Sequence, residues 1–221
     1  MNTERRTYSQ YCPLARALDV IGERWTLLVV RELLSGPKRF KDLQDALVGI
    51  GTNLLSTRLK DMEKHGLVVR SKLPPPGVAM VYALTDHGRR LDEVVLSLAR
   101  WGTTLLEEPR KESEHFRPHW LLNGMLSMYD PDLGRDLDKT YEFRIDDEVF
   151  HIVVQDGKAK GDMGRAQRPD LVWMSDSRAF MELVFGVTPI DKAASPNALI
   201  VGDRDTLKQA LELFNPVPIR R

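Results

Sequence analysis

A helix with a polar front, followed directly by two short β-rich segments, limits the folds that are open to the first half of this chain. The apolar residues of the helix recur at positions i, i+4 and i+7, as Leu55, Leu59 and Met62, and so form a single seam. Segments 67–73 and 78–84 are β-rich and are joined by a proline-rich tip. This order predicts a helix that packs by its back and presents polar residues to a partner.

Further helices are predicted on both sides of this stretch. Periodic apolar residues indicate helices over 13–21, 24–34 and 40–47, and Thr85 is placed to cap a long helix over 85–106. Short helices followed by two strands around a projecting tip are typical of a winged helix-turn-helix, in which one helix enters the major groove of B-DNA. We therefore expect the polar front to contact DNA.

The polar front and its surroundings offer two kinds of side chain to DNA. Short hydrogen-bonding residues stand at the start of the helix, where base edges are read: Thr52, Asn53, Ser56 and Thr57. Basic residues that we expect to meet phosphates lie further along this helix, at the start of the preceding helix and on the hairpin stems: Arg58, Lys60, Lys64, Lys38, Arg39, Lys41, Arg70 and Lys72. The alternative is that these residues form an ordinary solvated surface.

Five short motifs occur in order within residues 11–102. They are Cys-Pro at 12–13, GERW at 22–25, Arg-Phe at 39–40, LSTRLK at 55–60 and Leu-Thr-x-x-Gly at 84–88. With these motifs the segment resembles the HxlR-type transcription regulators. The resemblance implies a homodimer whose interface is formed by the first and last helices of the domain. It also implies two recognition helices that enter successive major grooves.

Cys12 is the one cysteine of the chain, which excludes an internal disulfide and a CxxC metal site. The resemblance implies a further role, because some members of the family are thought to use a cysteine here as a thiol sensor of oxidants or electrophiles. The helix that follows and the nearby arginines would favour the thiolate. The alternative is a small buried residue at the dimer interface.

The composition is that of an ordinary globular protein, with 42% hydrophobic and 29% charged residues. Residues 1–102 carry a net charge of +5 (16 basic against 11 acidic) and residues 103–221 a net charge of −5 (16 against 21), which fits a DNA-binding half joined to a different module.

No segment approaches the roughly 18 apolar residues of a membrane helix, and the N-terminal segment lacks a signal core, so we expect a cytoplasmic protein without membrane contact. The sequence has no GxSxG, HExxH or Walker motif, so we expect neither an enzyme nor a metal or cofactor site.

The second half alternates between predicted strands and helices. Three stretches, DDEVFHIVVQDGKAKGD, RPDLVWMSDSRAFMELVFG and NALIVGDRDTLKQALELF, make residues 138–215 resemble the sterol carrier protein type 2 fold. The resemblance implies a sheet covered by helices around an apolar cavity for lipid-like molecules. The candidate wall residues are Trp173, Phe180, Met181, Val184, Phe185 and Phe214. The alternative is that these residues form a plain core.

The predicted class is α+β: a winged helix-turn-helix domain followed by a sterol-carrier-like α/β sandwich. The predicted limits are 1–106 for the DNA-binding and dimerisation domain, 107–116 for a linker and 117–221 for an effector-binding domain. We expect a transcription regulator of the HxlR type that binds an inverted repeat in double-stranded DNA as a homodimer, with a hydrophobic small molecule as effector. The alternative is a carrier of hydrophobic ligands whose winged helix contacts protein.

Overall fold

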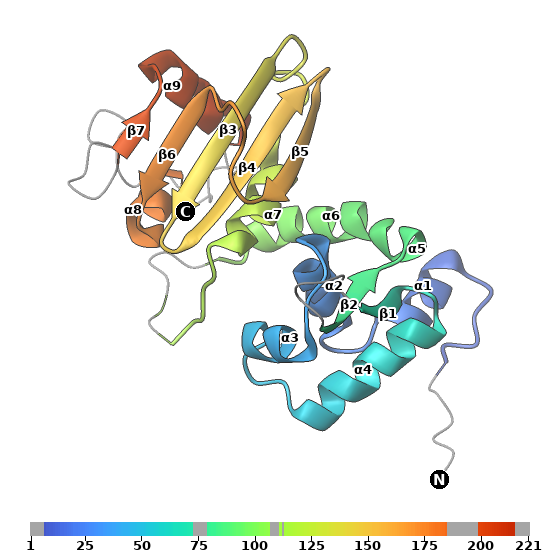
Figure 1. The fold of residues 1–221 in the computed structure, drawn as a ribbon. Coiled ribbons are helices and arrows are strands. Elements are labelled where there is room, and N and C mark those ends of the chain that lie inside the picture. Colours follow the sequence, from blue (N-terminus) through green and yellow to red (C-terminus); the bar gives the residue numbers. More distant parts are fainter. Residues whose placement is uncertain (1–6, 73–78, 107–110, 112, 185–198, 215–221) are drawn as a thin grey trace. The chain divides into compact units, whose positions relative to one another are not determined.

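The structure, a computed structural model, describes residues 7–72, 79–106, 111, 113–184 and 199–214. It divides into two compact units, Met1–Val95 and Leu96–Arg221, each with its own hydrophobic core (Figure 1). The division falls inside helix α6 (Asp92–Thr103). Residues 107–110 and 112 of the predicted linker lie outside the described residues, and the predicted domain limits stay a prediction. In the described part of the chain, no helix combines the length and the apolar character that crossing a membrane requires.

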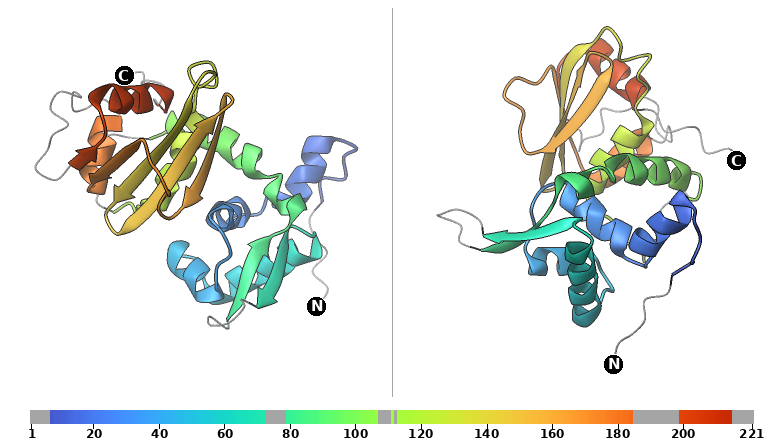
Figure 2. Two further views of the ribbon diagram at one scale, coloured as in Figure 1. Left: turned by 45° about the horizontal axis from the view of Figure 1, so that its top comes forward. Right: turned by 90° about the vertical axis from the view of Figure 1, so that its right-hand side faces the viewer.

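The first unit consists of short helices and a two-stranded sheet. Its elements before α6 are α1 (Pro13–Ile21), α2 (Thr26–Leu34), α3 (Phe40–Ala46), α4 (Thr52–Lys64), β1 (Val68–Lys72), β2 (Met80–Leu84) and α5 (Asp86–Arg89). Strands β1 and β2 pair antiparallel, with Val68 opposite Leu84 and Lys72 opposite Met80. The β1–β2 hairpin projects from the helices of its unit (Figure 2). The predicted order of helices and hairpin is confirmed, whereas the proline-rich tip lies outside the described residues.

Helix α4 forms where its apolar seam predicts it. Leu55, Leu59 and Met62 are at most 2% exposed and pack in the core of the first unit. Gly66 follows the helix with a φ of 66°, a conformation that glycine adopts without strain. Helix α2, in contrast, begins two residues later than predicted. The reason is that Trp25 has a left-handed φ of 80°, which a right-handed helix cannot include.

The long helix predicted over 85–106 is wrong as a single element, because the structure divides it into α5 and α6. The hydroxyl of Thr85 accepts a hydrogen bond from the Gly88 backbone N–H at 3.0 Å and so caps the short first helix. Gly88 packs directly against the backbone of Leu67, where any Cβ would collide with the carbonyl oxygen. This close approach fixes the first turn against the base of the hairpin, and α6 starts afresh at Asp92.

The second unit is built around a five-stranded sheet in the described part of the chain, with strand order β5-β4-β3-β6-β7. After α6 its elements are α7 (His119–Met128), β3 (Asp138–Ile145), β4 (Glu148–Gln155), β5 (Lys158–Met163), β6 (Leu171–Ser175), α8 (Ser177–Val184), β7 (Leu199–Val201) and α9 (Arg204–Leu213). Strands β3 and β4 pair antiparallel as a hairpin, with Ile145 opposite Glu148. Strand β6 pairs parallel to β3. The α+β class is therefore confirmed.

Helices α7, α8 and α9 cover one face of this sheet (Figure 1). The strand residues that face them alternate along the chain, as a half-buried strand requires, and are fully buried: Tyr141, Phe143, Ile145, Phe150, Ile152, Val154, Leu171 and Trp173. Leu122, Phe180 and Leu213 complete the core from the three helices. A sheet with helices against one face agrees with the prediction, but a relation to sterol carrier protein type 2 stays a prediction.

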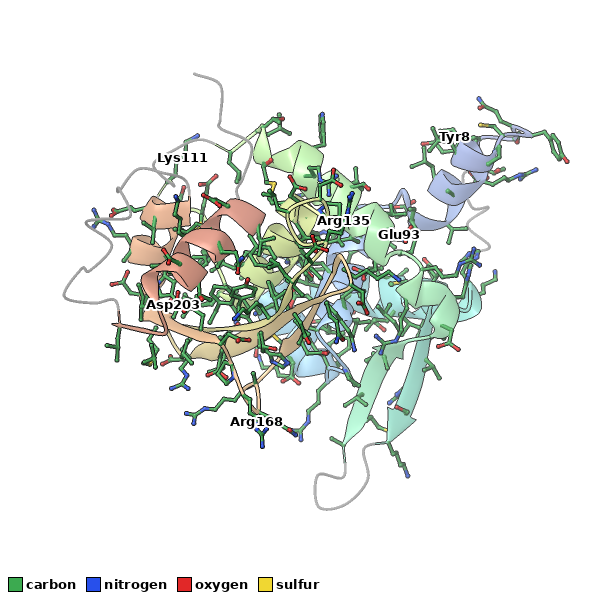
Figure 3. The ribbon with its side chains drawn as sticks, turned by 90° about the horizontal axis from the view of Figure 1, so that it is seen from above. Tyr8, Glu93, Lys111, Arg135, Arg168 and Asp203 are labelled. Carbon is green, nitrogen blue, oxygen red and sulfur yellow. The ribbon has the colours of Figure 1, made fainter. Side chains whose placement is uncertain are left out.

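The segment that joins β5 to β6 crosses the opposite face of the sheet. The Ala166 N–H donates to one carboxylate oxygen of Glu142 at 2.7 Å, and Arg144 Nε donates to the other at 2.7 Å. Glu142 is only 1% exposed, so these two donors satisfy a buried charge. Arg168 lies on this side of the sheet, away from α8 and α9 (Figure 3).

Candidate nucleic-acid interface

Helix α4 carries an exposed polar and basic stripe opposite its buried seam. Asn53, Thr57, Lys60 and Lys64 are spaced at i, i+4, i+7 and i+11 and are all exposed. This spacing places them on one face of a helix with 3.6 residues per turn. The Thr57 hydroxyl donates to the Asn53 carbonyl at 2.9 Å, so it keeps its acceptor lone pairs for a partner. The structure thus aligns four of the residues predicted to contact DNA.

The first residue of α4 is held by a side chain that the sequence did not single out. Gln44 of α3 donates from Nε2 to the Thr52 hydroxyl oxygen at 2.7 Å. The bond links the end of one helix to the start of the next and orients the Thr52 side chain, which is exposed. Ser56, one turn on, is half-buried. Gln44 was missed because its partner is eight residues away and no helical spacing connects the two.

Arg58 has a different environment from the other basic residues of α4. Its side chain is 13% exposed, and its guanidinium lies 3.0 Å from the Glu23 carboxylate and 3.2 Å from that of Asp61. Its Nε atom is buried without a hydrogen-bond partner in the described part of the chain. Two carboxylates therefore hold the guanidinium against the turn that follows α1. Its predicted contact with phosphate stays a prediction.

The basic residues at the start of α3 are also tied to their surroundings. Lys38 exchanges both backbone hydrogen bonds with Tyr82 of β2, and its ammonium lies 3.9 Å from the fully buried Glu32. Arg39 is exposed, and its backbone N–H donates to Asp42 at 3.0 Å. Lys41 reaches into solvent with its side chain 74% exposed, 2.7 Å from Asp45. This end of α3 is thereby joined to the hairpin by main-chain bonds.

The hairpin stem presents two basic side chains to solvent. Arg70 is exposed and stacks its guanidinium over the Tyr82 ring, 5.9 Å from the ring centre. Lys72 is exposed at the last described residue of β1, opposite Met80. Both positive charges therefore lie on the hairpin that projects beside α4, as the sequence predicted.

An exposed apolar side chain also belongs to the start of α4. Leu54 is 38% exposed although it neighbours the buried Leu55. In the sequence it stands off the i, i+4, i+7 seam, which is the signal that could have separated it from the core residues.

Helices α1 and α6 expose apolar side chains. On α6, Val94, Leu98 and Trp101 recur at i, i+4 and i+7 and are 38%, 46% and 64% exposed. On α1, Leu14 is 68% exposed, and Cys12 stands half-buried as the residue before the helix. The N-terminal segment that carries Tyr8 lies beside α1 (Figure 3).

Three of the candidate pocket residues, Trp173, Phe180 and Phe214, lie in the core of the second unit. The rings of Trp173 and Phe180 are 4.7 Å apart, and Phe214 packs against Tyr129 and Tyr141, each 5.9 Å away. Met181 is half-buried, whereas Phe185 and the side chain of Val184 lie outside the described residues. The structure therefore places Trp173 and Phe180 together and Phe214 beside two tyrosines.

Two buried polar atoms in this core have no hydrogen-bond partner in the described part of the chain, namely Trp173 Nε1 and Tyr129 Oη. The Tyr141 hydroxyl does have one, because it donates to Gln209 at 3.0 Å. Burial raises the pKa of both Tyr129 and Tyr141 above the ordinary value for a phenol. Both hydroxyls therefore stay protonated at neutral pH.

Residues 20–110 match the model of a protein family described as HxlR-like helix-turn-helix. Over 100 residues the chain is 35% identical to the uncharacterized HTH-type transcriptional regulator YvaP of Bacillus subtilis (strain 168). This alignment covers 45% of this chain and 93% of YvaP. The chain is 34% identical over 107 residues to the HTH-type transcriptional regulator YodB of the same organism, covering 45% of this chain and 96% of YodB. Among solved structures, the redox regulator HypR in its oxidized form aligns with a TM-score of 0.41 and 30% identity, over 43% of this chain and 99% of HypR. Through its N-terminal half, the chain belongs to the HxlR-like helix-turn-helix family.

Proposed function

We propose that the chain is a sequence-specific, DNA-binding transcription regulator that binds an inverted-repeat operator as a homodimer. The observation that carries the proposal is the exposed stripe on α4, beside a projecting hairpin with two further positive charges. Asn53 and Thr57 have side chains that hydrogen-bond to base edges, and Lys60 and Lys64 can neutralise phosphates. A seam of fully buried residues anchors the helix from behind, so that its front is presented rigidly.

The exposed apolar stripe on α6 and the apolar residues of α1 support the homodimer. A two-fold axis would bring the same patch of each protomer together and place two copies of α4 in one complex. Two recognition helices read half-sites about 34–36 Å apart, one turn of the DNA helix. A symmetric dimer therefore requires an inverted repeat in the operator.

DNA binding is tested by fluorescence anisotropy with duplexes that the full-length protein enriches from a random library. We expect one enriched inverted repeat and an affinity that falls steeply as the salt concentration rises, because phosphate neutralisation releases counterions. The rival function, a ligand carrier whose winged helix contacts protein, predicts weak retention without a salt slope. Absence of an enriched sequence would therefore reject the regulator.

For the second unit we propose an effector module whose hydrophobic ligand alters the spacing of the two recognition helices. Trp173 Nε1 and Tyr129 Oη are buried without a hydrogen-bond partner among the described residues, and this supports the proposal, because such an atom is costly and a ligand that carries a polar group would supply a partner. Native mass spectrometry of the full-length protein tests the proposal. We expect an added mass that corresponds to a bound compound. Organic solvent should release this compound, and adding it back should change the affinity for DNA. A clean dimer that no hydrophobic compound affects would reject it.

Thiol sensing at Cys12 stays a prediction. The half-buried thiol directly precedes α1, close to the apolar patch proposed as the dimer contact, so a modified Cys12 would alter that contact. A Cys12→Ser variant should keep DNA affinity and lose the response to diamide. An unchanged response in the variant would remove Cys12 from the mechanism.

A further inference from the structure

Leu54 is an apolar side chain within the polar front of α4. It is the third residue of the helix and 38% exposed, directly after the exposed residues Thr52 and Asn53. The core does not require it, because the buried seam of α4 is complete without it. Single exposed leucines are common on protein surfaces, so exposure by itself says little. What distinguishes Leu54 is its place in the first turn of the helix proposed to enter the groove.

The helix geometry sets Leu54 on one flank of the exposed stripe. At about 100° per residue, Leu54 is turned one step from Asn53, and Thr52 occupies the opposite flank of the stripe. Arg58 stands one turn further along the flank of Leu54, where its ion pair with Glu23 ties that side of the helix to the turn after α1. The N-terminal residues of a recognition helix contact base edges in the major groove, so a side chain in this turn is placed to meet a base edge.

We propose that Leu54 reads the 5-methyl group of one thymine in each operator half-site. The inference rests on the proposed DNA-binding function. Base edges in the major groove present hydrogen-bond donors and acceptors, and the thymine methyl is the apolar group among them. A leucine placed against a donor or acceptor would remove water from it without replacing the hydrogen bond. Leu54 therefore favours thymine at its position and disfavours cytosine, which offers an amino group and no methyl.

Replacement of thymine by deoxyuridine tests the contact, because deoxyuridine lacks only the 5-methyl group. The probe is the duplex enriched by the full-length protein, with each thymine replaced in turn in both half-sites together. At one position we expect the affinity of the unaltered protein to fall about 15-fold. This is about fourfold for each methyl, the equivalent of about 0.8 kcal/mol for a buried methyl group.

Two variants of Leu54 identify the residue that makes the contact. Leu54→Ala should bind the thymine and deoxyuridine duplexes equally at that position, whereas Leu54→Met should retain the preference for thymine. Because Leu54 is partly exposed, both variants should fold, and circular dichroism checks this. If Leu54→Ala does not fold, Leu54→Gln, which replaces the apolar end by an amide, takes its place.

The outcomes separate this inference from the function on which it rests. An enriched duplex with no thymine at which deoxyuridine weakens binding would overturn the role of Leu54 and leave the regulator intact. The same loss in the unaltered protein and in Leu54→Ala would assign the methyl contact to another residue. Failure to enrich any duplex would reject the proposed function itself.

Discussion

Glu23 and Arg58 form an ion pair, with Glu23 Oε2 lying 3.0 Å from Arg58 Nη2. Glu23 belongs to the turn between α1 and α2, and Arg58 is in the second turn of α4. The pair therefore joins the end of a helix proposed to form the dimer contact to the helix proposed to read DNA. A change in the position of α1 would be transmitted to α4 through this connection.

Removal of this ion pair should weaken both stability and DNA binding. We expect Arg58→Ala to lower the free energy of unfolding by about 1 kcal/mol, because the carboxylate partners are partly exposed and screened. Glu23→Gln should cost less, since it keeps the shape and removes the charge. A double-mutant cycle in urea unfolding measures the coupling. Because Arg58 is also predicted to contact phosphate, the Glu23 variant separates the two effects: an unchanged DNA affinity in Glu23→Gln beside a loss in Arg58→Ala would assign the effect on DNA to the phosphate contact alone.

The hydrogen bond from Gln44 to Thr52 should orient a base-reading hydroxyl. Gln44→Ala should reduce operator affinity about threefold for each half-site and so about tenfold for the dimer, because each protomer loses one net hydrogen bond of about 0.7 kcal/mol. The same substitution made in a Thr52→Ala background should have little further effect. Anisotropy titrations of the two single variants and the double variant check this. Additive losses would show that Gln44 contacts DNA by itself.

Lys60 and Asn53 should differ in what they contribute to binding. Lys60→Ala should weaken binding to all sequences alike and reduce the salt slope by about one in each protomer. Asn53→Ala should relax specificity at one base pair in each half-site and cost about 1–3 kcal/mol for each half-site of the best operator. Titrations on the operator and on single-base variants at several salt concentrations distinguish the two. Identical behaviour of the two variants would contradict the assigned roles.

A charge placed in the exposed apolar stripe of α6 should dissociate the homodimer. We expect Leu98→Arg to halve the mass in sedimentation equilibrium and to weaken operator binding by at least about 100-fold, because the two half-sites are no longer bound together. Glu93→Gln raises the net charge by the same one unit at an exposed position of α6 away from the stripe and serves as the control. A monomeric unaltered protein, or a dimeric Leu98→Arg variant, would place the interface elsewhere.

Acid should remove a stabilising interaction of Asp170. Burial by itself would raise the pKa of Asp170, but the hydrogen bond from the Thr140 N–H and the nearby Lys139 ammonium outweigh it and lower the pKa. A pKa that is lower in the folded than in the unfolded chain stabilises the fold above about pH 3.9, and this contribution is lost as the pH falls through the folded value. Asp170→Asn should therefore lose less stability than the unaltered protein between pH 5 and pH 3. Urea unfolding across this range measures the difference, and equal losses would contradict the prediction.

Much of the secondary structure could be predicted because its causes are local. Apolar spacing placed α1, α3 and α4. The cap of α9 is equally local, because the Asp203 carboxylate accepts the Thr206 N–H at 2.7 Å. For the second half the sequence predicted strands that alternate with helices, and the structure has both there. The break between α5 and α6 was missed because it depends on Gly88 packing against Leu67, 21 residues earlier in the chain.

The candidate interface divides in the same way. Residue type and helical period were enough to assign the exposed stripe of Asn53, Thr57, Lys60 and Lys64, because a helix repeats every 3.6 residues wherever it lies in the fold. Folding was needed to bring Glu23 to Arg58 and Gln44 to Thr52, since these pairs come from separate elements. Their contacts depend on how the helices pack, which no periodicity within one segment can encode. For this reason the sequence alone predicted that Lys60 and Lys64 face solvent or DNA. The two carboxylates that bind the Arg58 guanidinium could be identified only from the tertiary structure.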